Sequence, residues 1–367
     1  MTAPASPRLP QLPLQPGDCA PWFRAPALSG SDAYAFDTVA GRHVLLLFFD
    51  SAATAEVGGA LELVQLNRSL FDDEQACFFG ISADPQDAAQ GRIAQQLPGI
   101  RYFLDYQRQL SRLYGACDEG GYRPTWLLLD PALRVIDSFD LASGEAAIGQ
   151  LRRSLAADRG EGWAPVLLVP NLFPQALCDE LIAGYEREGG RESGFMREVG
   201  GKTVLLTDPL HKQRRDWAIE EQALRQRLLD HVRRGLSIPI ERAFQFRATR
   251  LERYIVGCYE AGAGHFRPHR DNTTRGTAHR RFAVTINLNA GDYDGGDLRF
   301  PEFGSRTYRA PTGGAVVFSC SLLHEATPVT RGRRYAFLPF LYDEQAARVR
   351  EANNPHLGEG LGAYRAR

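Results

Sequence analysis

The sequence predicts two domains, an α/β domain followed by a mainly β domain with flanking helices. The chain has 367 residues, of which 44% are hydrophobic, and this is more than one ordinary core accommodates. In the first third, apolar runs typical of buried strands alternate with segments of helical periodicity, as in a parallel α/β sheet. Over residues 247–341, short apolar runs alternate with Gly, Pro and Asp turns, which indicates an all-β barrel or jelly roll.

The first predicted elements are strands and helices in alternation. Strands are expected at residues 44–49 and 76–82, helices at 55–70, 85–97 and 106–114, and a closing hairpin at 125–130 and 133–137. Thr54 is the expected N-cap of the first helix. Pro131 and Ala132 are the expected two-residue turn of the hairpin.

The domain boundary is expected where the periodicity weakens, between residues 142 and 164. The predicted organisation is a disordered leader at 1–15, an α/β domain at 16–157, a second domain at 164–345 and a C-terminal tail at 346–367. Within the second domain, residues 174–188 and 220–234 are expected to be helical, and they precede the strand-rich region.

Composition excludes several classes of partner. The formal net charge is −1, so no strong field attracts nucleic acid or an anionic membrane. No apolar run approaches the roughly 20 residues of a membrane-spanning helix, and the leader lacks the apolar stretch of a secretory signal. The six cysteines form no C-x-x-C pair. We therefore expect a cytoplasmic protein with reduced thiols.

The candidate metal ligands are His269, Asp271 and His324. Residues two apart on a strand point to the same face, so His269 and Asp271 can reach one point. His324 follows an apolar run at residues 316–323 and supplies a third ligand. Two imidazoles and one carboxylate leave open positions on the metal, as non-haem Fe(II) requires for a chelating cosubstrate and O₂.

The candidate anion-binding residue is Arg334, ten positions after His324. A planar guanidinium binds a carboxylate through two parallel hydrogen bonds. A keto-diacid could therefore chelate the metal with one end and reach Arg334 with the other. The alternatives are a structural ion pair of Arg334, or Arg333 in its place.

This region resembles the prolyl 4-hydroxylase branch of the 2-oxoglutarate dioxygenases over residues 166–342. The matching positions are Tyr259, Gly262, Phe266, His269, Asp271, Leu288, Asn289, residues 293–298, residues 311–315, His324, Pro328, Val329, Gly332 and Arg334. The resemblance implies a double-stranded β-helix that uses Fe(II), 2-oxoglutarate, O₂ and ascorbate. It also implies hydroxylation of an unidentified substrate, such as a prolyl or other protein side chain or a small molecule, with release of succinate and CO₂.

Further cosubstrate contacts are expected from the inner face of the barrel. The resemblance implies that Tyr259 reaches 2-oxoglutarate, although a packed core aromatic is the alternative. Thr285 or Asn287 could donate a hydrogen bond to the same ligand, or each could be a satisfied interior residue. His265 is expected at the rim rather than on the metal, and His279 in a solvated loop at residues 273–280. Cys320 is expected to be a small buried hydrophobe.

Residues 16–141 resemble the peroxiredoxins of the AhpC/TSA family, which have a thioredoxin-like fold. The family's active site reads P-x-x-x-T-x-x-C. Here Thr54 aligns with the threonine, Asp50 stands at the proline and Val57 stands at the reactive cysteine. Arg123 matches an arginine that assists that cysteine. Peroxide attack requires a thiolate, which valine lacks.

The N-terminal domain is therefore expected to dock, present a substrate or form a homodimer, with redox sensing through Cys117 as an alternative. Two other functions stay open for the whole chain. One is a thiol-based redox or peroxide-handling protein, and the other is a non-catalytic protein that binds 2-oxoglutarate.

Overall fold

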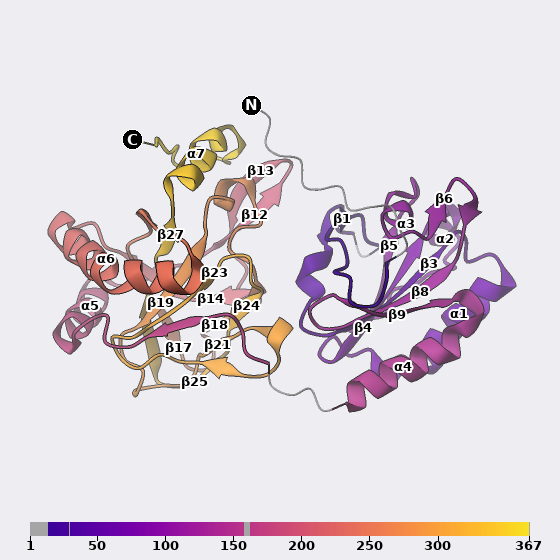
Figure 1. Ribbon diagram of the computed structural model, residues 1–367, viewed down its shortest axis with the longest axis horizontal. Coiled ribbons are helices and arrows are strands. Elements are labelled where there is room, and N and C mark those ends of the chain that lie inside the picture. The colour runs from indigo at the N-terminus through magenta and orange to yellow at the C-terminus, as the bar shows by residue number, and fades with distance from the viewer. Residues whose placement is uncertain (1–13, 29, 158–161, 367) are drawn as a thin grey trace. The chain divides into compact units, whose positions relative to one another are not determined.

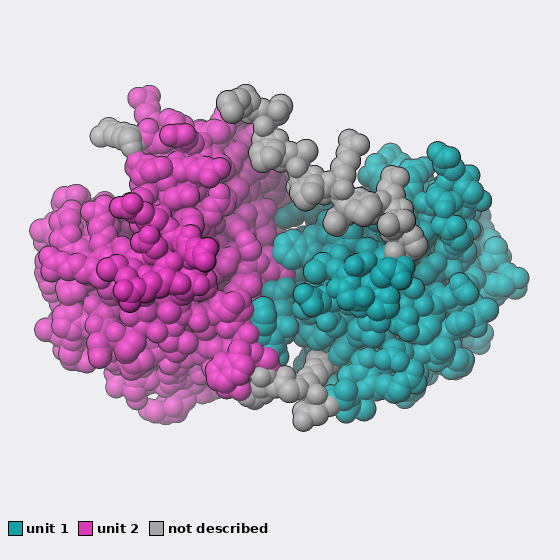
Figure 2. All heavy atoms as spheres, in the orientation of Figure 1, with its two compact units in different colours: residues 1–161, 301–304 teal, residues 162–300, 305–367 magenta. Residues whose placement is uncertain are grey.

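The computed structural model describes residues 14–28, 30–157 and 162–366. The chain divides into two compact units (Figures 1 and 2): unit 1 comprises residues 1–161 and 301–304, and unit 2 comprises residues 162–300 and 305–367. Each unit has its own hydrophobic core. The predicted domain limits remain a proposal. In the described part of the chain, no helix has the length and apolar character needed to cross a bilayer.

Unit 1 is built on a five-stranded sheet with the order β5-β4-β3-β8-β9. Its strands are β3 (His43–Phe49), β4 (Ala76–Ser82), β5 (Ile100–Leu104), β8 (Thr125–Leu129) and β9 (Val135–Asp140). β3 pairs in parallel with β4 and antiparallel with β8. Every residue of β3 and β4 is buried, which explains their continuous apolar sequences. The short pairs are β1 (Arg24–Ala25) with β2 (Tyr34–Ala35), and β6 (Cys117–Asp118) with β7 (Gly121–Tyr122).

Two helices of unit 1 contribute side chains to the same core as the sheet. They are α1 (Ala55–Leu66) and α4 (Gly144–Ala156). Thr54 caps α1, because its hydroxyl accepts a hydrogen bond from the backbone N–H of Val57 at 3.3 Å. The predicted helix at 55–70 is correct up to Leu66, after which residues 68–70 form a 3₁₀ turn, η2 (Arg68–Leu70).

Two predicted helices of unit 1 are much shorter than expected. α2 (Pro85–Ala89) replaces the predicted helix at 85–97. It ends because Gly91 adopts a left-handed φ of +67° and the N–H groups of Arg92 and Ile93 turn back to the carbonyl oxygen of Asp87. α3 (Gln109–Leu113) replaces the helix at 106–114.

The predicted hairpin exists, but its two-residue turn is wrong. Five residues, 130–134, connect β8 to β9. The Asp130 carboxylate accepts hydrogen bonds from the N–H groups of Ala132 and Arg134 at 2.9 and 2.8 Å, and this stabilises the wider loop. Strand β5 was not predicted.

Unit 2 contains two main sheets. The larger has nine strands, with the path β10-β23-β19-β26-β17-β15-β11 and with β16 and β27 beside it. Its strands are β10 (Leu167–Val169), β11 (Arg191–Glu192), β15 (Arg215–Ala218), β16 (Arg250–Glu252), β17 (Ile255–Glu260), β19 (Phe282–Asn287), β23 (Ala315–Ser319), β26 (Arg333–Phe337) and β27 (Phe340–Tyr342). The smaller sheet has the order β14-β18-β24-β21-β22. Its strands are β14 (Lys212–Gln213), β18 (His265–His269), β21 (Leu298–Arg299), β22 (Thr307–Tyr308) and β24 (His324–Ala326).

Two further antiparallel pairs complete the strands of unit 2. They are β12 (Phe195–Val199) with β13 (Lys202–Leu206), and β20 (Asp294–Gly295) with β25 (Val329–Arg331). Together, the two units bear out the predicted combination of an α/β domain and a mainly β domain.

Helices α5 (Gln175–Glu188) and α6 (Gln222–Phe244) share one hydrophobic core with the nine-stranded sheet. Alternation along β19 produces this core, since Phe282, Val284 and Ile286 belong to it while Ala283 and Thr285 line a cavity. The nine-stranded sheet therefore separates a helix-covered core from a cavity.

Helix α6 extends ten residues beyond the predicted end at residue 234. It continues past Gly235 and through Pro239 because Leu236 and Ile240 extend its buried stripe. Tertiary burial thus overrides two residues that disfavour helices. The C-terminal segment contains α7 (Glu344–Ala352) and the 3₁₀ turn η6 (Asn354–His356).

Candidate metal centre

Strands β18 and β24 bring His269, Asp271 and His324 together. His269 and His324 are directly opposite each other in this antiparallel pair, and Asp271 lies two residues beyond His269. The Nε2 atoms of His269 and His324 are 3.6 and 3.3 Å from the carboxylate oxygens of Asp271. One potential ligand atom from each residue lies within 4.8 Å of the others, so the three can bind one ion.

Backbone carbonyl groups orient both imidazoles. The Nδ1 atom of His269 lies 2.7 Å from the carbonyl oxygen of Arg267, and that of His324 lies 3.0 Å from the carbonyl oxygen of Leu322. A carbonyl can only accept, so each Nδ1 carries the proton. Each Nε2 consequently presents its lone pair toward Asp271, as a metal-binding histidine requires.

The pKa values favour the ligand forms of these side chains. Burial and the neighbouring His324 lower the pKa of His269 to about 4, so its imidazole is neutral at neutral pH. Burial would raise the pKa of Asp271, but the nearby His324 and His269 outweigh burial and hold it well below its ordinary value. A neutral imidazole and an ionised carboxylate are the states that coordinate a divalent cation.

The triad faces a cavity lined by residues of both main sheets. Arg334 is 2% exposed, and its Nε and Nη1 atoms have no hydrogen-bond partner among the described residues. An unsatisfied buried guanidinium is costly. The cavity thus offers two charge-assisted donors to an anion that lies beside the triad.

Tyr259 is directly opposite Arg334 in the β17–β26 pair. This register places both side chains on the cavity face, and the Arg334 guanidinium lies 5.1 Å from the centre of the Tyr259 ring. Arg333 has a different role, since it is exposed and pairs with Glu186 at 3.0 Å. Of the two neighbouring arginines, only Arg334 lines the cavity.

The other predicted cosubstrate residues separate into two groups. Thr285 lines the cavity and can donate a hydroxyl hydrogen bond there. Asn287 is not among the cavity-lining residues, and its Nδ2 donates to the carbonyl oxygen of Ala310 at 2.7 Å. The structure therefore assigns Asn287 a contact within the protein rather than a position beside the triad.

Three further predicted positions lie outside the triad. The ring of His265 lies within hydrogen-bonding distance of the carbonyl oxygen of Ala263. His279 is 1% exposed and pairs with Glu252 at 2.5 Å. The prediction of a solvated loop at 273–280 is wrong, because a capping box orders it and several of its side chains are buried. Cys320 is fully buried, and burial raises the pKa of its thiol.

The sequence prediction missed Arg214 and Arg253, which also line the cavity. Arg214 forms an ion pair with Asp216 on β15, and its Nη1 donates to the Tyr259 hydroxyl at 3.2 Å. Arg253 lies in the short connection between β16 and β17. Neither residue belongs to a recognisable spacing pattern, and only the pairing of β15 with β17 reveals that Arg214 lies near Tyr259.

Comparison with protein families agrees with this geometry. Residues 254–342 match the model of the 2OG-Fe(II) oxygenase superfamily, and this segment contains every residue of the triad as well as Arg334. Unit 2 is similar to the 2OG-Fe(II) oxygenases. Residues 16–138 match the AhpC/TSA family, so unit 1 is similar to peroxiredoxins.

Individual relatives of the oxygenase-like unit carry hydroxylase names. A PKHD-type hydroxylase of Synechococcus sp. (strain JA-2-3B'a(2-13)) is 32% identical over 124 residues, which are 31% of this chain and 54% of that protein. The chain thus spans about half the length of this curated relative. A prolyl hydroxylase structure from Trichoplax adhaerens, bound to a peptide of hypoxia inducible factor, gives a TM-score of 0.41 at 18% identity, and covers 51% of this chain and 86% of that one.

A peroxidoxin, BcpB from Mycobacterium tuberculosis, is among the solved structures similar to the peroxiredoxin-like unit. Its TM-score is 0.34 at 18% identity, and it covers 39% of this chain and 99% of that one. Val57, at the position of the reactive cysteine, is 3% exposed. Arg123 is mostly exposed and pairs with Asp118 instead of a thiol.

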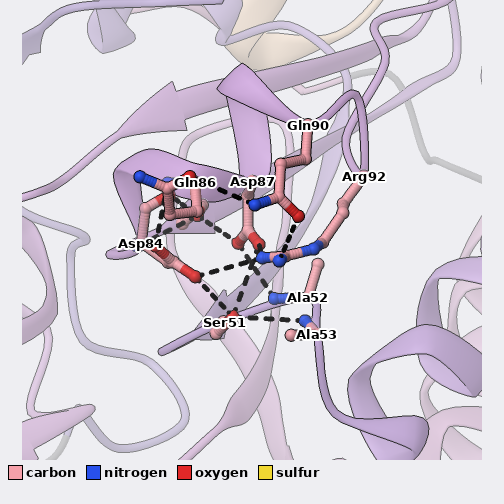
Figure 3. A network of polar contacts seen from close by, with 9 residues as sticks. Ser51, Ala52, Ala53, Asp84, Gln86, Asp87, Gln90 and Arg92 are labelled. Carbon is pink, nitrogen blue, oxygen red and sulfur yellow. Dashed lines mark hydrogen bonds and ion pairs between the residues drawn. The ribbon is translucent and has the colours of Figure 1, made fainter.

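A polar network occupies the start of the loop that precedes α1 (Figure 3). Ser51 donates its hydroxyl proton to Asp84 at 2.7 Å, and the N–H of Ala52 donates to Asp87 at 2.9 Å. Arg92 donates to the other oxygen of Asp87 at 3.0 Å. Asp87 is fully buried with both of its oxygens hydrogen-bonded, so this network anchors the loop.

Two of the three cysteines of unit 1 are buried, whereas Cys19 is exposed but lies outside the matched active-site motif at residues 50–57. Cys77 is fully buried, and burial raises the pKa of its thiol to about 12. Cys117 is also buried, at 6% exposure. Both thiols are therefore shielded from a peroxide or a partner thiol.

Proposed function

We propose that this protein is an Fe(II)- and 2-oxoglutarate-dependent dioxygenase that hydroxylates its substrate and releases succinate and CO₂. The convergence of two imidazoles and one carboxylate beside a guanidinium with unsatisfied donors carries this proposal. That donor set, with open coordination positions, suits non-haem iron. When bound, the iron would supply activation of O₂.

The residues of the chain have separate roles in this proposal. His269, Asp271 and His324 hold the metal, and the carbonyl groups behind the imidazoles keep each Nε2 directed at it. Arg334 binds the distal carboxylate of 2-oxoglutarate and orients the molecule. Tyr259 and Thr285 line the same space and supply hydroxyl groups.

We further propose that the two sheets of unit 2 form a double-stranded β-helix and that ascorbate supports turnover by keeping the iron reduced. The order of the strands and the position of the cavity between residues of both sheets support the fold proposal. The substrate is proposed to enter the same cavity.

The test of this function is anaerobic binding followed by exposure to O₂. Fe(II) and 2-oxoglutarate together should give a weak visible charge-transfer band, and O₂ should then release succinate. Asp271→Ala should lose the metal, because one of three protein ligands is gone. Wild-type protein that folds but shows neither signal would refute the proposal.

A non-catalytic 2-oxoglutarate-binding protein is the alternative that this experiment separates. Such a protein would bind 2-oxoglutarate with the metal but release no succinate when O₂ is admitted. The intact set of three ligands favours catalysis, because a vestigial site need not keep them all within 4.8 Å of one another.

A further inference from the structure

The cavity has more positive charge than the proposed iron and 2-oxoglutarate require. Its lining contains three arginines, Arg214, Arg253 and Arg334, and one carboxylate, that of Asp271. Asp216 stands behind Arg214 as a second carboxylate. Three guanidinium groups against two carboxylates leave one positive charge. A ferrous ion and the 2-oxoglutarate dianion would cancel each other, so this excess persists when both are bound.

The carboxylate of Asp216 is hydrogen-bonded mainly to Arg214. Its two oxygens accept hydrogen bonds from Nε and Nη2 of Arg214 at 2.6 and 2.8 Å. The second oxygen also accepts from the Ser193 hydroxyl. Lys212, which is 4% exposed, donates to Ser193 at 2.6 Å and so adds a further donor to this cluster. The carboxylate of Asp216 therefore makes its short contacts with Arg214 and Ser193 rather than with Arg253.

Arg253 shares the carboxylate of Asp216 with Arg214 and forms the longer ion pair of the two. Its closest approach to Asp216 is 3.5 Å, and its guanidinium lies 5.3 Å from the centre of the Phe340 ring. Within the described ranges, 14–28, 30–157 and 162–366, no hydrogen bond of its side chain is found. Glu252 next to it is hydrogen-bonded to Arg280 and His279.

The three arginines of the cavity differ in their exposure to solvent. The side chain of Arg253 is 28% exposed, compared with 5% for Arg214, and Arg334 as a residue is 2% exposed. Burial, and then the charge of Arg214, lower the pKa of Arg253 to about 10, which agrees with a cation whose ion pair with Asp216 does not fully offset burial. Arg253 is thus the guanidinium that an incoming molecule can reach.

We infer that Arg253 binds a carboxylate of the substrate, so that the protein acts on a carboxylate-bearing molecule rather than on a neutral peptide segment. This inference rests on the proposed function for the identity of the cavity as the substrate site. A guanidinium and a carboxylate match in charge and in planar geometry. The substrate would enter with its acid group at Arg253 and its reacting carbon toward the triad.

The experiment compares acids with their amides. Wild-type protein is loaded with Mn(II) and N-oxalylglycine, an unreactive analogue of 2-oxoglutarate, so that Arg334 is occupied. Calorimetry or ligand-observed NMR then measures the binding of hexanoate against hexanamide and of N-acetylproline against N-acetylprolinamide. We expect each acid to bind at least about tenfold more tightly than its amide, which corresponds to about 1.4 kcal/mol.

Three variants identify the residue responsible. Arg253→Gln should abolish the preference for the acid, and Arg253→Lys should retain part of it, while both bind Mn(II) and N-oxalylglycine within about twofold of wild type. Arg333→Gln is the matched control, because Arg333 is exposed and outside the cavity lining. Equal binding of acid and amide to wild type, or a preference that survives in Arg253→Gln, would overturn the inference.

A different experimental result would refute the proposed dioxygenase function itself. If wild type does not bind N-oxalylglycine with Mn(II), the dioxygenase proposal fails. The same acid and amide pairs, measured on the unloaded protein and on Arg253→Gln, would still decide whether Arg253 binds carboxylates.

Discussion

At the scale of single residues, Arg334 has the clearest expected phenotype. Arg334→Ala should still bind the metal, because the three ligands are intact, but should bind 2-oxoglutarate more weakly by roughly 2–5 kcal/mol, typical of a lost buried charged partner. Calorimetric titration of the Mn(II)-loaded protein measures this. Arg333→Ala should bind 2-oxoglutarate as wild type does. A comparable loss of affinity in that control would show that the effect is not specific to Arg334.

Glu252 offers a second test at this scale, through pH. Burial would raise the pKa of Glu252, but Arg280 and His279 hold it well below its ordinary value of 4.5. A lowered folded pKa stabilises the protein above the unfolded pKa, and this contribution is lost as pH falls through the folded value. Glu252→Gln should therefore destabilise the fold at pH 7 by about 3 kcal/mol, as for a broken buried ion pair.

The difference in unfolding free energy between wild type and Glu252→Gln should shrink as pH falls below about 4.5. Denaturant unfolding across this range measures it. Glu344→Gln is the control, because Glu344 pairs with Arg250 at the surface and should matter little. A difference that stays constant with pH would contradict this account of Glu252.

Site residues could be predicted from the sequence where their spacing along the chain determines their relative positions. His269 and Asp271 are two residues apart, and strand alternation predicted that they meet. They do meet, although β18 ends at His269 and Asp271 lies just beyond it. Arg214 could not be found in this way, because its proximity to Tyr259 arises from the pairing of β15 with β17. Arg253 lies in the connection between β16 and β17, where strand alternation does not apply. Asn287 shows that alternation alone is not sufficient. It is two residues from Thr285 on the same strand, yet its amide donates to the carbonyl oxygen of Ala310.

At the scale of elements, α6 should tolerate changes on only one face. Leu236 is fully buried in the core between α6 and the nine-stranded sheet, whereas Ile238 is 56% exposed. Leu236→Ala should lower the free energy of unfolding by about 3 kcal/mol, and Ile238→Ala by less than about 0.5 kcal/mol. Urea titration of both variants measures the contrast, and equal effects would mean that the buried face is misassigned.

Element boundaries were harder to predict than element types. Strands β3 and β4 were found because burial on both faces makes them continuously apolar. Helix α2 was predicted too long because its end depends on Gly91 and on the carbonyl group of Asp87. Helix α6 was predicted too short because tertiary burial, which local sequence does not reveal, carries it through Pro239.

At the scale of the whole molecule, the two units should differ in their chemistry. The sequence comparison predicts Val57 at the position of the peroxidatic cysteine, Cys77 and Cys117 are both buried, and the exposed Cys19 lies outside that motif. The full chain should therefore consume no peroxide with a thiol reductant beyond the rate of the reductant alone. Peroxide consumption that disappears in Cys117→Ser would instead support a thiol-based function. A role of unit 1 in homodimer formation remains a prediction.

The scarcity of lysine has a practical consequence for studying this chain. Lys202 and Lys212 are its only lysines, and Lys212 is buried with a pKa that burial and Arg214 lower. Lys202, at the exposed start of β13, is then the one lysine that an amine-reactive dye can reach easily. Labelling at mildly alkaline pH would attach a fluorophore there and at the chain's α-amino group, so the β12–β13 hairpin can be followed by fluorescence without introducing a mutation.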